Sequence, residues 1–154
     1  MRNTVLLSIA VAWSGIQFGT LWIMQTSILP LLNTRGDQDY IDTCQGIDMH
    51  FFHPIALWGG VLMMVNGLFL ATQVDDSTAK ITCAVAAAMM LGVGIVSEGK
   101  NRPIWRMIEK WKIGTMPGNW LELRRVWSLA HSLRTAFAFL GVVFFTLSLV
   151  LETT

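Results

Sequence analysis

Long apolar stretches separated by short polar segments form the pattern of this chain of 154 residues. Four stretches, at about residues 5–32, 51–72, 79–97 and 120–151, are long enough to cross a bilayer as helices, which takes roughly 20 apolar residues. The pattern predicts an all-α fold. We expect a single transmembrane domain over residues 1–154, built as an integral membrane four-helix bundle of up-and-down topology.

The polar segments predict how these spans are joined. We interpret residues 33–48 as a first loop after a helix that stops near Pro30, and residues 101–118 as a third loop after a helix that stops at Gly99. Within the third loop, apolar side chains recur at helical spacing with basic ones between them. This is typical of a short interfacial amphipathic helix between helices three and four. Its apolar positions are Ile104, Trp105, Ile108 and Trp111.

Composition and charge support a membrane protein and exclude some functions. Hydrophobic residues make up 53% of the chain and charged residues only 14%, against roughly 25% charged in a soluble domain. The net charge of +1 argues against nucleic acid as a partner. The two cysteines, Cys44 and Cys83, form no CxxC or metal-type spacing, so no disulfide framework or thiol redox motif is indicated.

Basic residues predict the orientation of the chain. They gather in residues 33–48 and 101–118, and few lie on the opposite side. The positive-inside rule therefore puts these two loops in the cytoplasm and both termini outside. We expect a multi-pass integral protein of the cell membrane or inner membrane, whose partner is the lipid bilayer. A homo-oligomer is compatible with a chain of this size, but no motif sets its order.

Polar side chains converge at one face of the predicted bundle. In an up-and-down bundle, the end of helix one, the start of two, the end of three and the start of four meet. His50, His53, Glu98, Asn101 and the segment 120–134 therefore line one mouth. This arrangement predicts a polar pocket for a small hydrophobic substrate at one membrane face, with Glu98 and Asn101 in its lining.

The last predicted helix carries a polar stripe. Arg124, Trp127, His131 and Arg134 are spaced by three, four and three residues, which places them on one helix face. Ionisable residues inside a membrane helix are costly and normally face the bundle interior or a water-filled cavity. The alternative is structural: Arg134 pairs with a carboxylate such as Glu98 or extends toward the interface, and His131 only hydrogen-bonds a neighbouring helix.

The histidines allow a further hypothesis. His50, His53 and His131 could form a three-imidazole metal site for copper or iron, or could exchange protons. The alternative for His50 and His53 is simple anchoring at the interface. Gln17 and Asn66 lie mid-span, where interhelical hydrogen bonding is the expected role.

The segment from Asn101 onward resembles a known family. The run Asn101-Arg102-Pro103-Ile104, the run Trp120-Leu121-Glu122-Leu123-Arg124-Arg125-Val126-Trp127, and then His131 and Arg134 are similar to the DUF1772 or anthrone-oxygenase-like family of small four-helix membrane proteins. The resemblance is specific only over residues 101–134. It implies oxidation of an activated, often phenolic or polycyclic, substrate by dioxygen without an obligatory cofactor. It further implies that His131 acts as the base, that Arg124 or Arg134 stabilises the enolate, and that Trp120 and Trp127 flank the aromatic ring.

Three functions therefore stay open at this point. The first is a membrane oxygenase or oxidase of the anthrone-oxygenase type, with no cofactor or with a bound copper or iron ion. The second is a metal- or haem-binding redox protein that uses His50, His53 and His131. The third is a non-catalytic membrane subunit or a small carrier.

Overall fold

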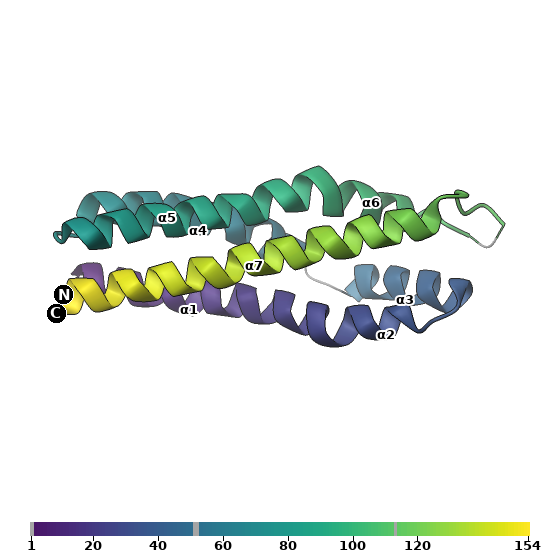
Figure 1. Ribbon diagram of the computed structural model, residues 1–154, viewed down its shortest axis with the longest axis horizontal. Helices are drawn as coiled ribbons and strands as arrows, with labels where there is room; N and C mark the ends of the chain where they lie inside the picture. The colour runs from purple at the N-terminus through teal and green to yellow at the C-terminus, as the bar shows by residue number, and fades with distance from the viewer. Residues whose placement is uncertain (1, 51–52, 113) are drawn as a thin grey trace.

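Helices account for all of the regular secondary structure in the described part of the chain. The computed structural model describes residues 2–50, 53–112 and 114–154, and their side chains except those of residues 2, 48–50 and 53–57. Within these residues there is no strand (Figure 1). The elements are α1 (Arg2–Ile23), the π-helical turn η1 (Met24–Ile28), α2 (Leu29–Asn33), α3 (Asp37–His50), α4 (His53–Gln73), α5 (Ser77–Val96), the π-helical turn η2 (Ser97–Asn101), α6 (Arg102–Ile108) and α7 (Trp120–Thr153).

Three continuous helices are long and apolar enough to cross a membrane. Because η1 joins α1 to α2 and η2 joins α5 to α6, these helices cover Asn3–Asn33, Ser77–Ile108 and Trp120–Thr153, with 31, 32 and 34 residues. At 1.5 Å per residue each is about 45–50 Å long, whereas the hydrocarbon core is about 30 Å thick. The expectation of a helical membrane protein is confirmed at this level, and each helix extends well beyond the hydrocarbon.

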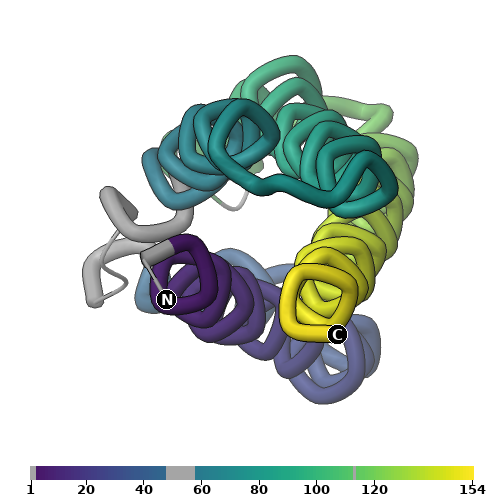
Figure 2. The backbone as a smooth tube through the Cα atoms, turned by 90° about the vertical axis from the view of Figure 1, so that its left-hand side faces the viewer, coloured from purple at the N-terminus to yellow at the C-terminus, as the bar shows by residue number. Residues whose placement is uncertain are grey.

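The long helices lie side by side, with both termini at the same end (Figures 1 and 2). At that end Asn3 Nδ2 donates to the Gln73 carbonyl at 2.8 Å and to Glu152 Oε1 at 3.1 Å. The other Glu152 oxygen accepts from the Asp75 amide at 3.2 Å. Polar contacts therefore hold the two termini and the turn between α4 and α5 together.

Between this end and the middle of the helices lies an apolar core, which we call the inner core. It contains Leu7, Ala10, Leu21, Met63, Leu70, Val74, Ala79, Cys83, Ala86, Met90, Val93, Ala138 and Phe145. A Cβ on Gly67 would lie 3.0 Å from Ala87 Cβ and from Phe145 Cζ, so α4 approaches α5 and α7 closely there. Small residues permit such close approach of helices in lipid.

The outer faces of the helices are also apolar. Ile16, Ile81 and Leu129 are 59%, 64% and 71% exposed. A soluble helix pairs its apolar face with a polar one, whereas these helices are apolar inside and outside. This distribution suits hydrocarbon as the surrounding medium.

A second cluster of buried side chains lies at the opposite end, and we call it the aromatic cap. It contains Leu29, Leu32, Tyr40, Ile41, Cys44, Ile104, Ile108, Trp111 and Trp127. The prediction of a loop at residues 33–48 is wrong, since most of this segment is α3, which packs under α6 and the start of α7 (Figure 1). Tyr40, Ile41 and Cys44 are each at most 2% exposed and form the inner face of α3. Packing against the cap therefore stabilises a helix whose sequence is mostly polar.

Both π-helical turns precede a proline. Pro30 follows η1 and Pro103 follows η2, each two residues beyond the turn. A proline inside a helix removes one hydrogen bond and crowds the carbonyl four residues before it, and a π-turn relieves that crowding by widening the helix locally. The predicted end of the first helix near Pro30 is confirmed, since that helix ends at Asn33, whereas the predicted stop at Gly99 is wrong, because the third long helix continues to Ile108. The expected interfacial helix is also not a separate element, because α6 continues α5 through η2.

Candidate functional site

Buried and half-buried polar side chains gather where the two π-helical turns face α7. We call this group the polar layer and define it as Gln17, Ser97, Asn101, His131 and Arg134. Gln17 is 6%, Asn101 4% and His131 0% exposed. The layer lies between the inner core and the aromatic cap. It brings together three of the residues that the sequence predicted for a site, namely Asn101, His131 and Arg134.

His131 is bound at both ring nitrogens. Its Nε2 lies 3.0 Å from the Leu21 carbonyl oxygen. Its Nδ1 lies 3.1 Å from Arg134 Nε and 2.6 Å from Arg134 Nη2. A carbonyl only accepts and a guanidinium only donates, so Nε2 carries the hydrogen and Nδ1 accepts. The imidazole is therefore neutral in this arrangement, and the interhelical hydrogen bond of the structural alternative is present.

Arg134 is a cation that has no carboxylate partner among the described side chains. Besides His131, its guanidinium reaches Ser97 Oγ at 3.5 Å. Among the residues that the structure describes, the ion pairs are Arg35–Asp39 and Arg102–Glu98, and neither includes Arg134. A charge in a membrane interior is costly unless it is paired. The polar layer therefore offers an anionic or strongly polarised oxygen a favourable place beside Arg134.

Two buried acceptors in the layer also lack donors. Within the described part of the chain, Gln17 Oε1 and Asn101 Oδ1 have no hydrogen-bond partner, although Asn101 Nδ2 lies 3.5 Å from the Trp127 carbonyl. A Cβ on Gly60 would lie 3.5 Å from Gln17 Nε2, so the glycine leaves room beside that amide. An unsatisfied buried acceptor costs about 1–3 kcal/mol. A ligand with hydroxyl groups would satisfy these oxygens.

Trp127 borders the polar layer on the cap side. It is 2% exposed, and its ring centroid lies 6.2 Å from that of His131 and 5.4 Å from that of Trp105. Trp127 is thus the member of the aromatic cap that borders the polar layer. It is the fourth predicted site residue in this neighbourhood.

Arg124 and Trp120 lie elsewhere, in the aromatic cap. Arg124 Nη2 donates to the Leu32 carbonyl at 2.5 Å and to Asn33 Oδ1 at 2.9 Å. Its guanidinium carbon lies 4.3 Å from the Tyr40 ring centroid and 5.8 Å from that of Trp120. Seven residues separate Arg124 from His131, about 10 Å along the helix axis. In this geometry Arg124 holds α2 and α3 against α7.

Glu98 also lies apart from the polar layer. It is exposed, and its Oε2 lies 2.7 Å from Arg102 Nη1, one turn along the same helix. The expected pairing of Arg134 with Glu98 is therefore not made. Glu98 sits at the outer surface of η2, where it contributes little to an interior pocket.

The metal hypothesis cannot use His131 in this arrangement. A ring nitrogen that binds a metal must present a free lone pair, and both nitrogens of His131 are engaged. The side chains of His50 and His53 lie outside the described residues. Within the described residues, no group of three or more His, Cys, Asp or Glu side chains could hold a metal ion.

Some residues of the site were missed by the sequence interpretation. Ser97 binds Arg134, and Gln25 on η1 accepts from Ser132 at 3.1 Å. Gln17 was assigned to interhelical bonding only. Pro30 and Pro103 are the signal that could have pointed to these residues. Each proline follows a π-turn, π-turns often occur at functional sites, and both turns face the polar stripe of α7.

These features define the class: a helical membrane protein with a buried polar layer of neutral histidine and arginine between an apolar core and an aromatic cap. Comparisons with protein-family models, with characterised proteins and with solved structures give no match.

Proposed function

We propose that this chain is a membrane-embedded oxygenase that acts with dioxygen on a small, hydrophobic, aromatic or phenolic substrate bound at the polar layer. The observation that carries the proposal is Arg134, a half-buried guanidinium with no ion pair among the described residues and with a neutral histidine as its main partner. The resemblance of residues 101–134 to the anthrone-oxygenase-like family supports the same reaction class.

The proposal includes a bundle of four spans. α4 has 21 residues, which at 1.5 Å per residue gives about 31 Å, enough for the hydrocarbon core. The structure describes only some of the α4 side chains, so the argument for counting α4 as a span rests on its length and its apolar composition. The ends of the helices beyond the polar layer, with α3 and α6, then reach the headgroup level. The excess of basic residues in segments 33–48 and 101–118 supports a cytoplasmic position for that end.

The substrate chemistry follows from an acidic C–H or O–H group. An anthrone-like methylene loses a proton to give an enolate, whose oxygen pairs with Arg134. The carbanion carbon then bonds to dioxygen and forms a peroxide. Loss of water from the protonated peroxide leaves a ketone, so the CH₂ group and one O₂ become one C=O group and one H₂O. Electrostatic stabilisation of the enolate lowers the cost of the first step.

His131 and Arg134 act together in this scheme. While Arg134 donates to His131 Nδ1, that nitrogen cannot accept a proton. When the guanidinium turns to the substrate oxygen, Nδ1 is released and becomes available as the base. Substrate binding thereby uncovers the base, and the negative enolate offsets the positive charge that His131 acquires. Asn101 and Gln17 accept from substrate hydroxyls, and Trp127 packs on the ring.

Oxygen uptake with an anthrone tests the proposal. Detergent-purified protein should consume one O₂ per anthrone oxidised to anthraquinone, above a protein-free blank that measures autoxidation. Arg134→Gln and His131→Asn should each lower turnover at least about a hundredfold. Arg106→Gln, at an exposed arginine on α6, is the matched control and should retain turnover. Full turnover in folded Arg134→Gln protein contradicts the proposal.

Other results of the same preparation separate the alternatives. Stoichiometric copper or iron that is lost on replacement of His50, His53 and His131 would favour the metal-dependent redox protein. Saturable binding of the anthrone without oxygen uptake would favour the carrier or subunit, because Gln17 and Asn101 can hold a ligand without reaction.

A further inference from the structure

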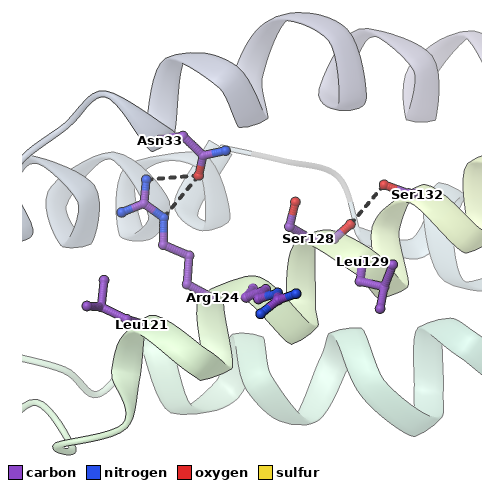
Figure 3. A pocket seen from close by; sticks show the side chains of 7 residues that line it. Asn33, Leu121, Arg124, Ser128, Leu129 and Ser132 are labelled. Carbon is purple, nitrogen blue, oxygen red and sulfur yellow. Dashed lines mark hydrogen bonds between the residues drawn. The ribbon is translucent and has the colours of Figure 1, made fainter.

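A shallow groove lies on the side of α7 next to Asn33, and its lining contains none of the five residues that define the polar layer. It has a volume of about 540 Å³ and is lined by Asn33, Leu121, Arg124, Arg125, Ser128, Leu129 and Ser132. Figure 3 shows its floor, with Arg124 linked to Asn33 and with Ser128 and Ser132 further along the helix. The lining contains two arginines and no carboxylate. The groove is therefore a region of positive potential with hydroxyl and amide groups.

The two arginines of the groove are in different states. Arg124 is fixed by the Leu32 carbonyl and by Asn33. Arg125 is exposed, and within the described part of the chain it has no hydrogen bond or ion pair. One guanidinium is thus held in place, and the other is available to a ligand from outside.

The surroundings of the groove favour a lipid over a free ion. Leu121 and Leu129 border it and are 62% and 71% exposed, and Leu133, one turn beyond Leu129 toward the inner core, is 49% exposed. A free phosphate ion makes no favourable contact with these apolar side chains, whereas the acyl chains of a lipid pack against them. In the membrane position proposed above, the groove lies where α7 leaves the hydrocarbon core, which is the depth of the lipid headgroups. Basic pockets between membrane helices on the cytoplasmic side recognise anionic headgroups.

We propose that this groove binds the phosphate of an anionic phospholipid, with Arg125 and Ser128 on the phosphate oxygens and Leu129 and Leu133 along an acyl chain. Arg124 contributes charge from its fixed position. The site is separate from the polar layer, because Arg125 and Ser128 lie on the outer face of α7 and His131 on the inner one. The inference does not depend on the proposed oxygenase activity.

Lipid titration of the full-length protein in detergent tests the inference. Native mass spectrometry should show phosphatidylglycerol bound more tightly than phosphatidylcholine of the same chains. Arg125→Gln should weaken the phosphatidylglycerol complex about fivefold, since a basic residue near the headgroup contributes about 1 kcal/mol. Ser128→Ala should weaken it less. Arg106→Gln removes the same charge from α6 and should leave the affinity unchanged.

Three outcomes overturn the inference. Equal losses in Arg125→Gln and Arg106→Gln would show attraction to the basic end as a whole. Equal affinity for the two lipids would show that headgroup charge plays no part. Displacement of the lipid by millimolar inorganic phosphate or glycerol phosphate would show an anion site that does not need acyl chains. Arg125 has no hydrogen-bond or ion-pair partner to lose among the described residues, so its variant is expected to fold, and an unchanged melting temperature checks this.

Discussion

The inner core and the aromatic cap occupy opposite halves of the same helices, but different forces hold them. The inner core packs alanine, leucine, methionine and a close glycine contact, and the outer faces of its helices are apolar. In the cap, tryptophans and Tyr40 pack around Arg124, which binds backbone oxygen on α2. Between them lies the polar layer. The difference teaches that tight apolar packing holds the helices together in one half, while directional polar contacts of Arg124 hold α2 and α3 against α7 in the other.

The largest expected effect is on activity at Arg134, where a substitution should reduce oxygen uptake much more than stability. Arg134→Leu should abolish oxygen uptake, at least about a hundredfold, because no charge is left to pair with the enolate. The melting temperature in detergent should fall little, since the variant also removes the cost of a buried cation. A variant that loses stability and activity together would assign Arg134 to the structure alone.

The second prediction concerns the clamp on α3. Arg124→Ala should destabilise the cap by about 2–3 kcal/mol, because it removes hydrogen bonds from a charged donor and the contact with Tyr40. Limited proteolysis should then cut within residues 34–47 before the inner core unfolds. Arg125→Ala is the matched control and should leave the cleavage rate unchanged. Equal protection in both variants would contradict the clamp.

The third prediction addresses the inner core. Gly67→Ala should cost about 1–2 kcal/mol, because its Cβ would lie 3.0 Å from Ala87 and Phe145. Thermal unfolding should shift downward, while the Michaelis constant for the anthrone should not change. Gly15→Ala is the control, since no atom lies within 4 Å of a Cβ there. If Gly15→Ala is equally destabilising, helix-wide effects rather than close packing decide the stability.

The smallest expected effect is a weakening of the cap at alkaline pH. Burial raises the pKa of the Cys44 thiol from 9.0 to about 11, and burial also raises the pKa of Tyr40. Between pH 9 and 11 the unfolded thiol ionises while the folded one stays protonated, so stability falls as pH rises, by roughly 1 kcal/mol at pH 10. Denaturation of the cap measured by tryptophan fluorescence from pH 8 to 11 checks this. The decline should be shallower in Cys44→Ala.

The sequence predicted a helical membrane protein because an apolar run long enough to cross the bilayer can form few structures other than a membrane-spanning helix. The last helix was predicted from 120 to about 151, and it covers Trp120–Thr153. The stripe of Trp127, His131 and Arg134 was also found, because helical spacing places these residues on one face.

Two features could not be predicted from local pattern. α3 has acidic residues in its first turn and only a narrow apolar face, so its helix depends on Tyr40 and Cys44 packing against residues far along the chain. The separation of Arg124 from the polar layer depends on the end of α2, which supplies the carbonyl of Leu32. Spacing on one helix shows which side chains share a face and does not show which neighbour each one reaches.

The two π-helical turns have a consequence for how this chain tolerates change in length. A π-turn holds one more residue than an α-turn, so each acts as a single-residue insertion that shifts the phase of the helix by about 100°. Leu29 and Leu32 beyond η1, and Ile104 and Ile108 beyond η2, pack in the cap with the helix phase that follows this shift. Loss of one residue from 24–28 or 97–101 would restore a regular helix and turn those side chains outward. The rotational position of the cap side chains relative to the rest of each helix therefore depends on one extra residue in each π-turn.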